Sequence, residues 1–261
     1  MQKNQKAIAL GMRLKNCKNV RTLGIKADFT DYSSEEKELI LNAPVIYYPS
    51  SLYAELFDTM GIKTFPGHNA YRYAQDKIKQ TAVFKLLEIP HPFTRVFYGK
   101  NQQQTIMDYF SYPFIAKIPR GSAMGKGVFL IQNDADLKDY LSISKIAYIQ
   151  EYIKIDRDMR IIVIGGKIAH AYWRISGSNS FKTNIAAGGS ISLDPIPDEA
   201  KNLARQTAQA CKWDDVGIDI ILKENQYYVL EGNFKYGHEG FKAAKIDYIK
   251  LMEQKIENGE I

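Results

Sequence analysis

The sequence predicts an α+β protein, and two observations support that class. Two pairs of β-rich segments, at residues 160–173 and 215–231, are each joined by a short turn, which is typical of antiparallel hairpins. From residue 112 onward, segments with helical spacing lie between such strands without a regular strand–helix alternation. This mixture favours α+β over a doubly wound parallel sheet.

Composition limits the classes of partner. The chain has 261 residues, 45% hydrophobic and 25% charged, as expected for a folded protein of one large or two moderate domains. Its net charge of +6 is scattered without a basic block, so an anionic small molecule explains it as well as nucleic acid does. No apolar run approaches the roughly 18 residues of a membrane-spanning helix. We therefore expect a cytoplasmic protein without nucleic-acid or membrane partners, and self-association is left open.

The N-terminal elements form a strand–helix–strand pattern. Residues 7–11 and 43–49 are β-rich, residues 52–60 have helical spacing, and residues 61–66 resemble a short returning strand. The pattern predicts a small α/β unit over residues 1–70.

The middle of the chain combines helices with a glycine-rich turn between two strands. A helix is expected at 76–87, before the breakers Pro90 and Pro92. The other expected elements are strands at 112–119 and 127–132, a helix at 137–142 and a strand at 145–152. We expect a central unit over residues 71–147.

The remaining segment, residues 148–261, contains both hairpins. The first turns at Gly165-Gly166, a dipeptide that suits a two-residue turn. Between and after the hairpins, helices are expected at 197–213 and 246–257.

A lysine followed by a glycine-rich loop is the first candidate site. Lys117 ends a strand, and the loop contains Gly121, Ser122, Gly125 and Gly127. Glycines allow backbone N–H groups to close on phosphate oxygens, and lysine adds a positive charge. The bland alternative is a hairpin loop whose glycines serve turn geometry.

An acid pair is the second candidate. If the second hairpin has an odd loop, Asp219 lies opposite Glu231, and the carboxylates repel unless a hard cation lies between them. Without metal, one acid should then have a raised pKa. Asn233 lies two residues on and adds an oxygen on the same face. The alternative, surface acids on an edge hairpin, is weakened by the apolar residues around both acids.

Two further segments are weak candidates alone. The segment Gln150-Glu151-Tyr152 could present backbone groups to a purine, and Arg174 precedes a polar loop that suits phosphate or substrate contacts. Taken alone, the first segment is better explained as an ordinary charged loop, and solvated basic residues are a common alternative for the second.

Taken in order, these pieces resemble the motifs of the RimK-type ATP-grasp ligases, over residues 76–246. The acid pair and Asn233 match the family's Mg²⁺ ligands, and residues 181–184 (FKTN) resemble its F-R-S-N motif. Four departures are visible. Lys182 replaces an arginine, which removes a bidentate fork, and Gly232 replaces a branched residue between two metal ligands. Residues 233–237 lack the family's proline before glycine, and the N-terminal unit is short. The resemblance implies an ATP-grasp fold with a short α/β N-terminal unit, a central lid subdomain and a C-terminal subdomain with the metal site.

The resemblance also implies roles for individual residues. It makes Arg174 and Lys182 catalytic candidates and Asp219, Glu231 and Asn233 metal ligands. The residues that it assigns to ATP are Lys77, Lys117, Gly121, Ser122, Gly125, Gly127, Gln150, Glu151, Tyr152, Asp158, Arg160, Lys182 and Asn184.

The activity that the resemblance implies is an ATP-dependent carboxylate–amine ligase, which forms an amide or peptide bond through an acyl-phosphate. Its cofactors would be ATP and one or two Mg²⁺ ions, with Mn²⁺ as a potential substitute. Its substrates would be a small carboxylate and an amine, with an amino acid or peptide expected. Two alternatives stay open: a phosphotransferase without amine ligation, and a catalytically silent nucleotide-binding protein.

Overall fold

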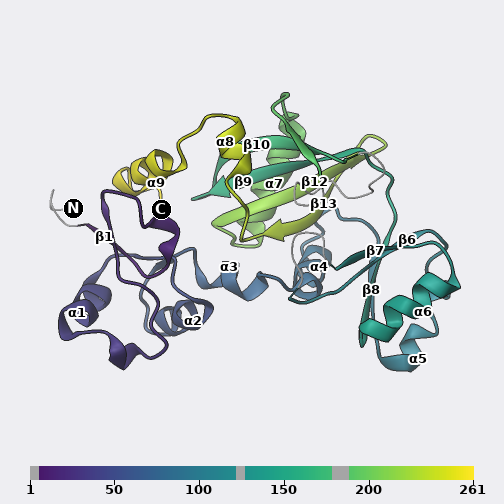
Figure 1. Cartoon of the computed structure of the whole chain (residues 1–261), viewed down its shortest axis with the longest axis horizontal. Coiled ribbons are helices and arrows are strands. Elements are labelled where there is room, and N and C mark those ends of the chain that lie inside the picture. The colour runs from purple at the N-terminus through teal and green to yellow at the C-terminus, as the bar shows by residue number, and fades with distance from the viewer. Residues whose placement is uncertain (1–5, 122–126, 178–187) are drawn as a thin grey trace.

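Three sheets organise the chain in the computed structural model, which describes residues 6–121, 127–177 and 188–261 (Figure 1). The N-terminal sheet is parallel, in the order β2-β1-β3-β4. The other two sheets are antiparallel, in the orders β5-β8-β6-β7 and β11-β10-β9-β12-β13. Helices are interspersed among them, so the α+β class is confirmed.

The N-terminal unit contains the expected strands and helix, together with several elements that were not expected. These include β2 and α1, and α1 begins with a capping box between Ser33 and Glu36. Only Ile40 of this helix is buried, so its apolar periodicity is weak. The elements are β1 (Ala7–Ala9), η1 (Met12–Leu14), β2 (Val20–Thr22), η2 (Phe29–Asp31), α1 (Ser34–Asn42), β3 (Ile46–Tyr47), α2 (Ser51–Thr59), β4 (Thr64–Phe65) and α3 (His68–Tyr73).

The central subdomain has a hydrophobic core of its own, built around Phe97, Phe114, Tyr140 and Ile149. Strand β8 crosses the expected boundary at 147/148 and hydrogen-bonds within the central sheet, so we propose that the boundary follows Glu151. The elements of this region are α4 (Lys77–Leu86), β5 (Thr94–Tyr98), α5 (Gly99–Gln103), η3 (Ile106–Asp108), β6 (Phe114–Lys117), β7 (Val128–Ile131), α6 (Asp134–Ile143) and β8 (Ile146–Glu151).

Both predicted hairpins form in the C-terminal subdomain. Gly165 and Gly166 adopt φ of 62° and 73°, as a two-residue turn of the primed type requires. The elements are β9 (Arg157–Ile164), β10 (Lys167–Ile175), β11 (Ser190–Ser192), α7 (Asp198–Ala210), β12 (Asp215–Lys223), β13 (Gln226–Asn233), α8 (Glu239–Ala243) and α9 (Tyr248–Glu257).

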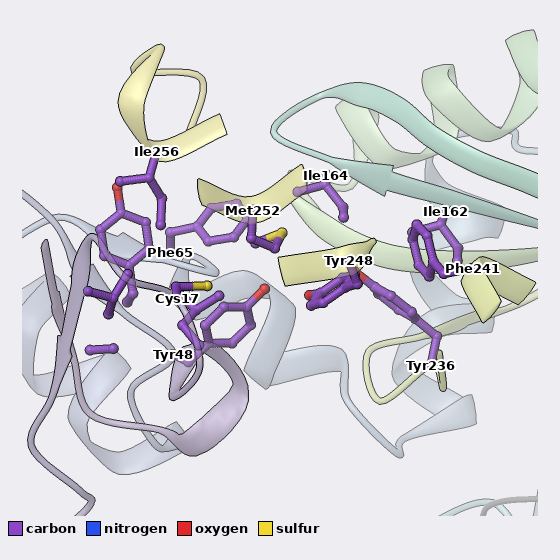
Figure 2. Close-up of a cluster of buried hydrophobic side chains, with 14 of the residues drawn as sticks. Cys17, Tyr48, Phe65, Ile162, Ile164, Tyr236, Phe241, Tyr248, Met252 and Ile256 are labelled. Carbon is purple, nitrogen blue, oxygen red and sulfur yellow. The ribbon is translucent and has the colours of Figure 1, made fainter. Parts of the chain in front are cut away.

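The N-terminal unit and the central subdomain lie at opposite ends of the molecule, with the C-terminal sheet between them (Figure 1). One buried cluster joins the N-terminal unit to the C-terminal subdomain, and it contains Tyr48 and Phe65 beside Ile164, Met252 and Ile256 (Figure 2). Helix α4 packs against the C-terminal sheet, where Phe84 belongs to the same core as Trp213. None of the helices in the described part of the chain is long and apolar enough to cross a membrane.

Candidate active site

The acid pair lies where β12 and β13 face each other. Asp219 pairs with Glu231, so their side chains share a face. The expected odd loop is wrong: Lys223 pairs with Gln226, which leaves a two-residue turn. A β-bulge corrects the register, because Ile220 pairs with Val229 and Leu230 is the extra residue. The bulge, and not the loop, brings the two carboxylates together.

Two arginines hold the carboxylate of Asp219, which is only 2% exposed. Arg160 donates from both Nε and Nη2, the latter at 2.9 Å, and Arg174 Nη2 lies 2.9 Å from Asp219 Oδ2. Burial would raise the pKa of Asp219, but the two guanidinium groups outweigh it and hold the pKa below its ordinary value. Asp219 is therefore not the acid with the expected raised pKa, because arginines and not a second acid are its nearest partners.

Asp158 and Arg174 form a second, bidentate pair on neighbouring strands. They occupy paired positions of β9 and β10, and Arg174 donates from Nε and Nη2 to the two Asp158 oxygens at 2.6 and 2.7 Å. Arg160 lies two residues after Asp158 on β9 and faces Asp219 across the ladder. Asp158 and Arg160, the D-x-R of the sequence, thus belong to a buried network of alternating charge that also contains Arg174 and Asp219.

Lysines from the central region approach this network. Lys77 is the first residue of α4, and its Nζ lies 3.7 Å from Glu231 Oε2. Lys117 ends β6 and is buried. Burial, opposed by the attraction of Glu231, lowers the pKa of Lys117 to about 8. Lys77 therefore pairs with one of the two carboxylates and Lys117 interacts electrostatically with both, which is a suitable arrangement for a phosphate chain with its metal ion.

The expected adenine-binding segment uses its side chains for internal contacts. Gln150 is buried and donates to Thr94 Oγ1 at 2.9 Å. The Glu151 carboxylate accepts from the Phe93 N–H at 2.8 Å and pairs with Lys223 at 2.8 Å. Tyr152 is half-buried. Since the side chains of Gln150 and Glu151 are engaged in these contacts, the backbone after β8 is the part of this segment available to read a base.

The glycine-rich loop is described only at its ends. Gly121 has φ of 67° and donates to the Gln75 carbonyl at 3.2 Å, and the Gly127 carbonyl accepts from the Ile118 N–H at 2.7 Å. The other expected nucleotide contacts, at Ser122, Gly125, Lys182 and Asn184, lie outside the described residues.

The donor set of the proposed metal site is two carboxylates and one amide. Asn233 ends β13, and its Oδ1 accepts from the Lys235 N–H at 3.2 Å. Within the described ranges, no group of three or more His, Cys, Asp or Glu side chains could hold a metal. Hard oxygen donors of this kind fit Mg²⁺, which usually takes one or two protein carboxylates together with substrate phosphates.

Two residues that support the acid hairpin, Gln80 and Trp213, were not predicted from the sequence. Gln80 of α4 accepts from the Gly232 N–H at 2.9 Å and donates to the Gly232 carbonyl at 3.0 Å. A Cβ at Gly232 would lie 2.6 Å from the Trp213 ring, which explains why glycine stands between Glu231 and Asn233. The position of Gln80, one helical turn after Lys77, was the available signal.

Comparison with solved structures defines the class of fold. D-alanine–D-alanine ligase from Bacillus anthracis superposes with a TM-score of 0.70 over 97% of this chain and 96% of its own, at 15% identity. A RimK domain protein from Sphaerobacter thermophilus gives a TM-score of 0.67 over 95% of this chain and 98% of its own, at 12% identity. The fold is therefore an ATP-grasp fold, as expected.

The family follows from sequence. A family model described as a RimK-like ATP-grasp domain matches residues 74–256, so the chain belongs to that family and the expected resemblance is confirmed. The coenzyme gamma-F420-2:alpha-L-glutamate ligase of Methanococcus maripaludis is 31% identical over 190 residues, which cover 69% of this chain and 66% of that protein. A probable alpha-L-glutamate ligase of Parasynechococcus marenigrum is 30% identical over 209 residues, 77% of this chain and 45% of that protein. The chain thus matches less than two thirds of either relative.

Proposed function

We propose that this protein is an ATP-dependent carboxylate–amine ligase that forms an amide or peptide bond and releases ADP and phosphate. The observation that supports this most is the convergence of Lys77 and Lys117 on the Asp219–Glu231 pair, across the boundary between two subdomains. Membership of an ATP-grasp family implies the use of ATP, with Mg²⁺ typical.

We assign the two lysines to the phosphates of ATP. Asp219, Glu231 and Asn233 would hold one or two Mg²⁺ ions, for which Mn²⁺ could substitute. The metal would supply charge neutralisation on the phosphoryl group in transfer. Asp219 is held in one orientation by the series of ion pairs Arg160–Asp219–Arg174–Asp158, so this ligand is preorganised before nucleotide binds.

The proposed reaction has two steps. A carboxylate oxygen of the first substrate attacks the terminal phosphorus of ATP, the bond to ADP breaks, and an acyl-phosphate forms. The amine nitrogen of the second substrate then attacks the acyl carbon, phosphate leaves, and the amine loses a proton. We propose Arg174 and Lys182 as the groups that stabilise the developing negative charge.

We propose an amino acid as the amine, with L-glutamate as the first to test. The basis is the names of two relatives, which are L-glutamate ligases. A small acid or the end of a peptide would supply the carboxylate.

The decisive experiment measures ADP release with Mg²⁺-ATP, a panel of small carboxylates and each of the twenty amino acids as amine. A ligase requires ADP release that depends on both substrates, with an amide product by mass spectrometry. ADP release that needs no amine and gives a stable phosphorylated product would instead establish a phosphotransferase. Nucleotide binding without ADP release in any combination would establish a silent nucleotide-binding protein.

A second experiment tests the base-reading segment. Mg²⁺-ATP should raise the melting temperature by binding the native state, and Mg²⁺-GTP should raise it less. Equal shifts with the two nucleotides would remove residues 150–152 from the nucleotide site.

A further inference from the structure

A buried polar cluster lies where the N-terminal unit meets the C-terminal subdomain. Arg13 of η1 and Tyr48, which follows β3, come from the N-terminal unit. Asp215 begins β12, Tyr236 follows β13, and Tyr248 begins α9. Figure 2 shows the three phenol rings with their hydroxyl oxygens turned toward one another. None of these residues belongs to the nucleotide and metal site described above.

Arg13 is enclosed by aromatic rings. Its guanidinium carbon lies 4.5 Å from the ring centre of Tyr236, 5.2 Å from that of Tyr248 and 5.6 Å from that of Tyr48. Its Nε donates to the Tyr248 hydroxyl at 2.8 Å. Its Nη2 is buried and has no hydrogen-bond partner among the described residues. A buried donor without an acceptor is costly, so this atom is the part of the cluster best suited to receive a ligand.

The nearby carboxylate of Asp215 does not satisfy this donor. Asp215 is 1% exposed, and its two oxygens accept from the hydroxyls of Tyr48, at 2.7 Å, and Tyr236. Burial opposes the charge of Arg13, but Tyr236, Tyr248 and Asp215 outweigh it and raise the Arg13 pKa. Arg13 therefore stays cationic while part of its hydrogen-bonding capacity is unused.

The cluster is continuous with the proposed active site. Asp215, Gly217 and Asp219 alternate along β12 and so share one face, with Asp215 and Asp219 about 13 Å apart along the strand. A Cβ at Gly217 would lie 2.9 Å from Arg160 Cδ and 3.1 Å from Tyr236 Cβ. The side chains of Arg160 and Tyr236 thus meet over Gly217 and connect the two ends of the face. Arg13 is partly exposed as a residue while its Nη2 is buried, so a ligand reaches this atom from the solvent side only when the surrounding rings shift slightly.

We propose that Arg13 binds a carboxylate of the amino-acid substrate, one that takes no part in bond formation. This inference rests on the proposed ligase function, which requires an acid and an amine near Asp219 and Glu231. A planar guanidinium between aromatic rings, with an N–H free of competing acceptors, fits a carboxylate oxygen. Arg13 is then a specificity-determining residue that selects an amine carrying this carboxylate over the same amine with an amide in its place.

The test uses thermal shift and ADP release on the full chain with Mg²⁺ and a nucleotide. The probes are L-glutamate, L-glutamine, which keeps only the α-carboxylate, and L-isoglutamine, which keeps only the side-chain carboxylate. The remaining L-amino acids and their amides complete the panel. The variants are Arg13→Met, Arg13→Lys and, as a matched control, Lys15→Met, which removes an exposed charge from the same segment.

In the wild type, at least one carboxylate-bearing probe should bind more tightly than its amide. Arg13→Met should weaken that probe about 10- to 100-fold, the usual range for one charge-assisted hydrogen bond. The amide should be affected little, so the acid-to-amide preference should collapse. Arg13→Lys should retain part of the preference, and Lys15→Met should retain all of it. The shift with Mg²⁺-ATP alone should be the same in all variants.

Other outcomes overturn the inference. An Arg13→Met protein that melts lower but keeps the wild-type preference would make Arg13 only a structural clamp. A wild type in which no carboxylate is preferred over its amide would also reject the subsite. A different result would contradict the ligase assignment alone. If binding of the carboxylate depends on Arg13 but ADP release does not depend on an amine, the subsite is supported and the proposed ligase reaction is wrong.

Discussion

The two ends of this molecule join the C-terminal sheet in opposite ways. The N-terminal unit shares a hydrophobic core with it, in which Tyr48 and Phe65 pack with Ile164, Met252 and Ile256. The central sheet and α6 bury their apolar side chains in a separate core, which contains Ile106 and Ile149. The N-terminal joint is therefore apolar, whereas on the central side the described apolar contact with the C-terminal core comes from α4, through Phe84, and not from the central sheet.

The contacts of the central sheet with the C-terminal subdomain are largely polar. Glu151 pairs with Lys223 at 2.8 Å, and Lys117 interacts electrostatically with Glu231 and Asp219, beside Lys77 of α4, which lies 3.7 Å from Glu231. Such contacts exchange with water at small net cost. We therefore expect the central sheet to move relative to the rest of the molecule, while the N-terminal unit moves with the C-terminal subdomain. The proposed nucleotide site lies at the joint that can open.

Glu231→Gln gives the largest expected effect and acts at the polar joint. Glutamine keeps the volume and one acceptor oxygen but loses the charge that would hold Mg²⁺. We expect ADP release to fall by about 10²- to 10³-fold or more, with little change in melting temperature, because the Glu231 side chain is 32% exposed. Glu224→Gln, in the exposed turn of the same hairpin, is the control. Wild-type turnover in Glu231→Gln would remove the metal site and the ligase assignment together.

Two core truncations test whether the two joints differ in cooperativity. Met252→Ala and Ile106→Ala each remove a side chain that is 0% exposed, at a cost of about 2–5 kcal/mol. Met252→Ala should lower the temperature of one unfolding transition that the N-terminal unit and the C-terminal subdomain share. Ile106→Ala should make the central sheet unfold in a separate transition at a lower temperature. Calorimetry distinguishes them, and a single shared transition in both variants would show that the two joints are equally cooperative.

Lys117→Ala should weaken nucleotide binding while leaving the apolar joint intact. Removal of a buried cation that faces phosphate should cost about 10- to 100-fold in ATP affinity. Lys138→Ala, on the exposed face of α6, removes the same type of charge from the same subdomain and should change nothing. Titration calorimetry with a non-hydrolysable ATP analogue measures both. Matching affinities in the two variants would separate Lys117 from the phosphates.

Asp214 gives the smallest effect, a pH dependence at the N-terminal joint. Its carboxylate accepts from the Gly67 N–H at 2.9 Å, and burial raises the Asp214 pKa from 3.8 to about 6. Between those values the unfolded chain loses the proton and the folded chain keeps it, so the contribution of Asp214 to stability falls as pH rises toward 6. The loss is complete about one pH unit above the folded-state pKa of about 6.

The measurement compares Asp214→Asn with the wild type. The variant should gain about 1–3 kcal/mol relative to the wild type between pH 4 and pH 7.5. Urea unfolding at both pH values measures this difference. A difference that is independent of pH would show that Asp214 titrates normally.

The sequence predicted elements whose signals are local. The Gly165-Gly166 turn and the apolar runs of both hairpins need only neighbouring residues, and both hairpins form where expected. The bulge at Leu230 had no such signal, because the run Tyr227–Leu230 is apolar throughout and does not show which residue is extra. For this reason the facing acids were predicted with the wrong loop.

The least predictable contacts join residues that are far apart in the chain. Arg13 and Tyr248 are separated by 235 positions, and Gln80 and Gly232 by 152. No periodicity relates such residues, and packing alone brings them together. The acid hairpin was therefore visible in the sequence, while the residues that support it and the aromatic enclosure of Arg13 were not.

The extra residue at Leu230 gives β13 one residue more than a regular ladder with a two-residue turn can pair. If Leu230 were kept but the bulge were lost, Leu230 would pair with Asp219 and Glu231 with Ile218, so the Glu231 side chain would turn to the opposite face. Deletion of Leu230 would instead remove the bulge and leave Glu231 directly after Val229, still opposite Asp219. We therefore expect the facing acids to survive the loss of this one residue, whereas a single insertion between Gln226 and Glu231 without a second bulge would separate them.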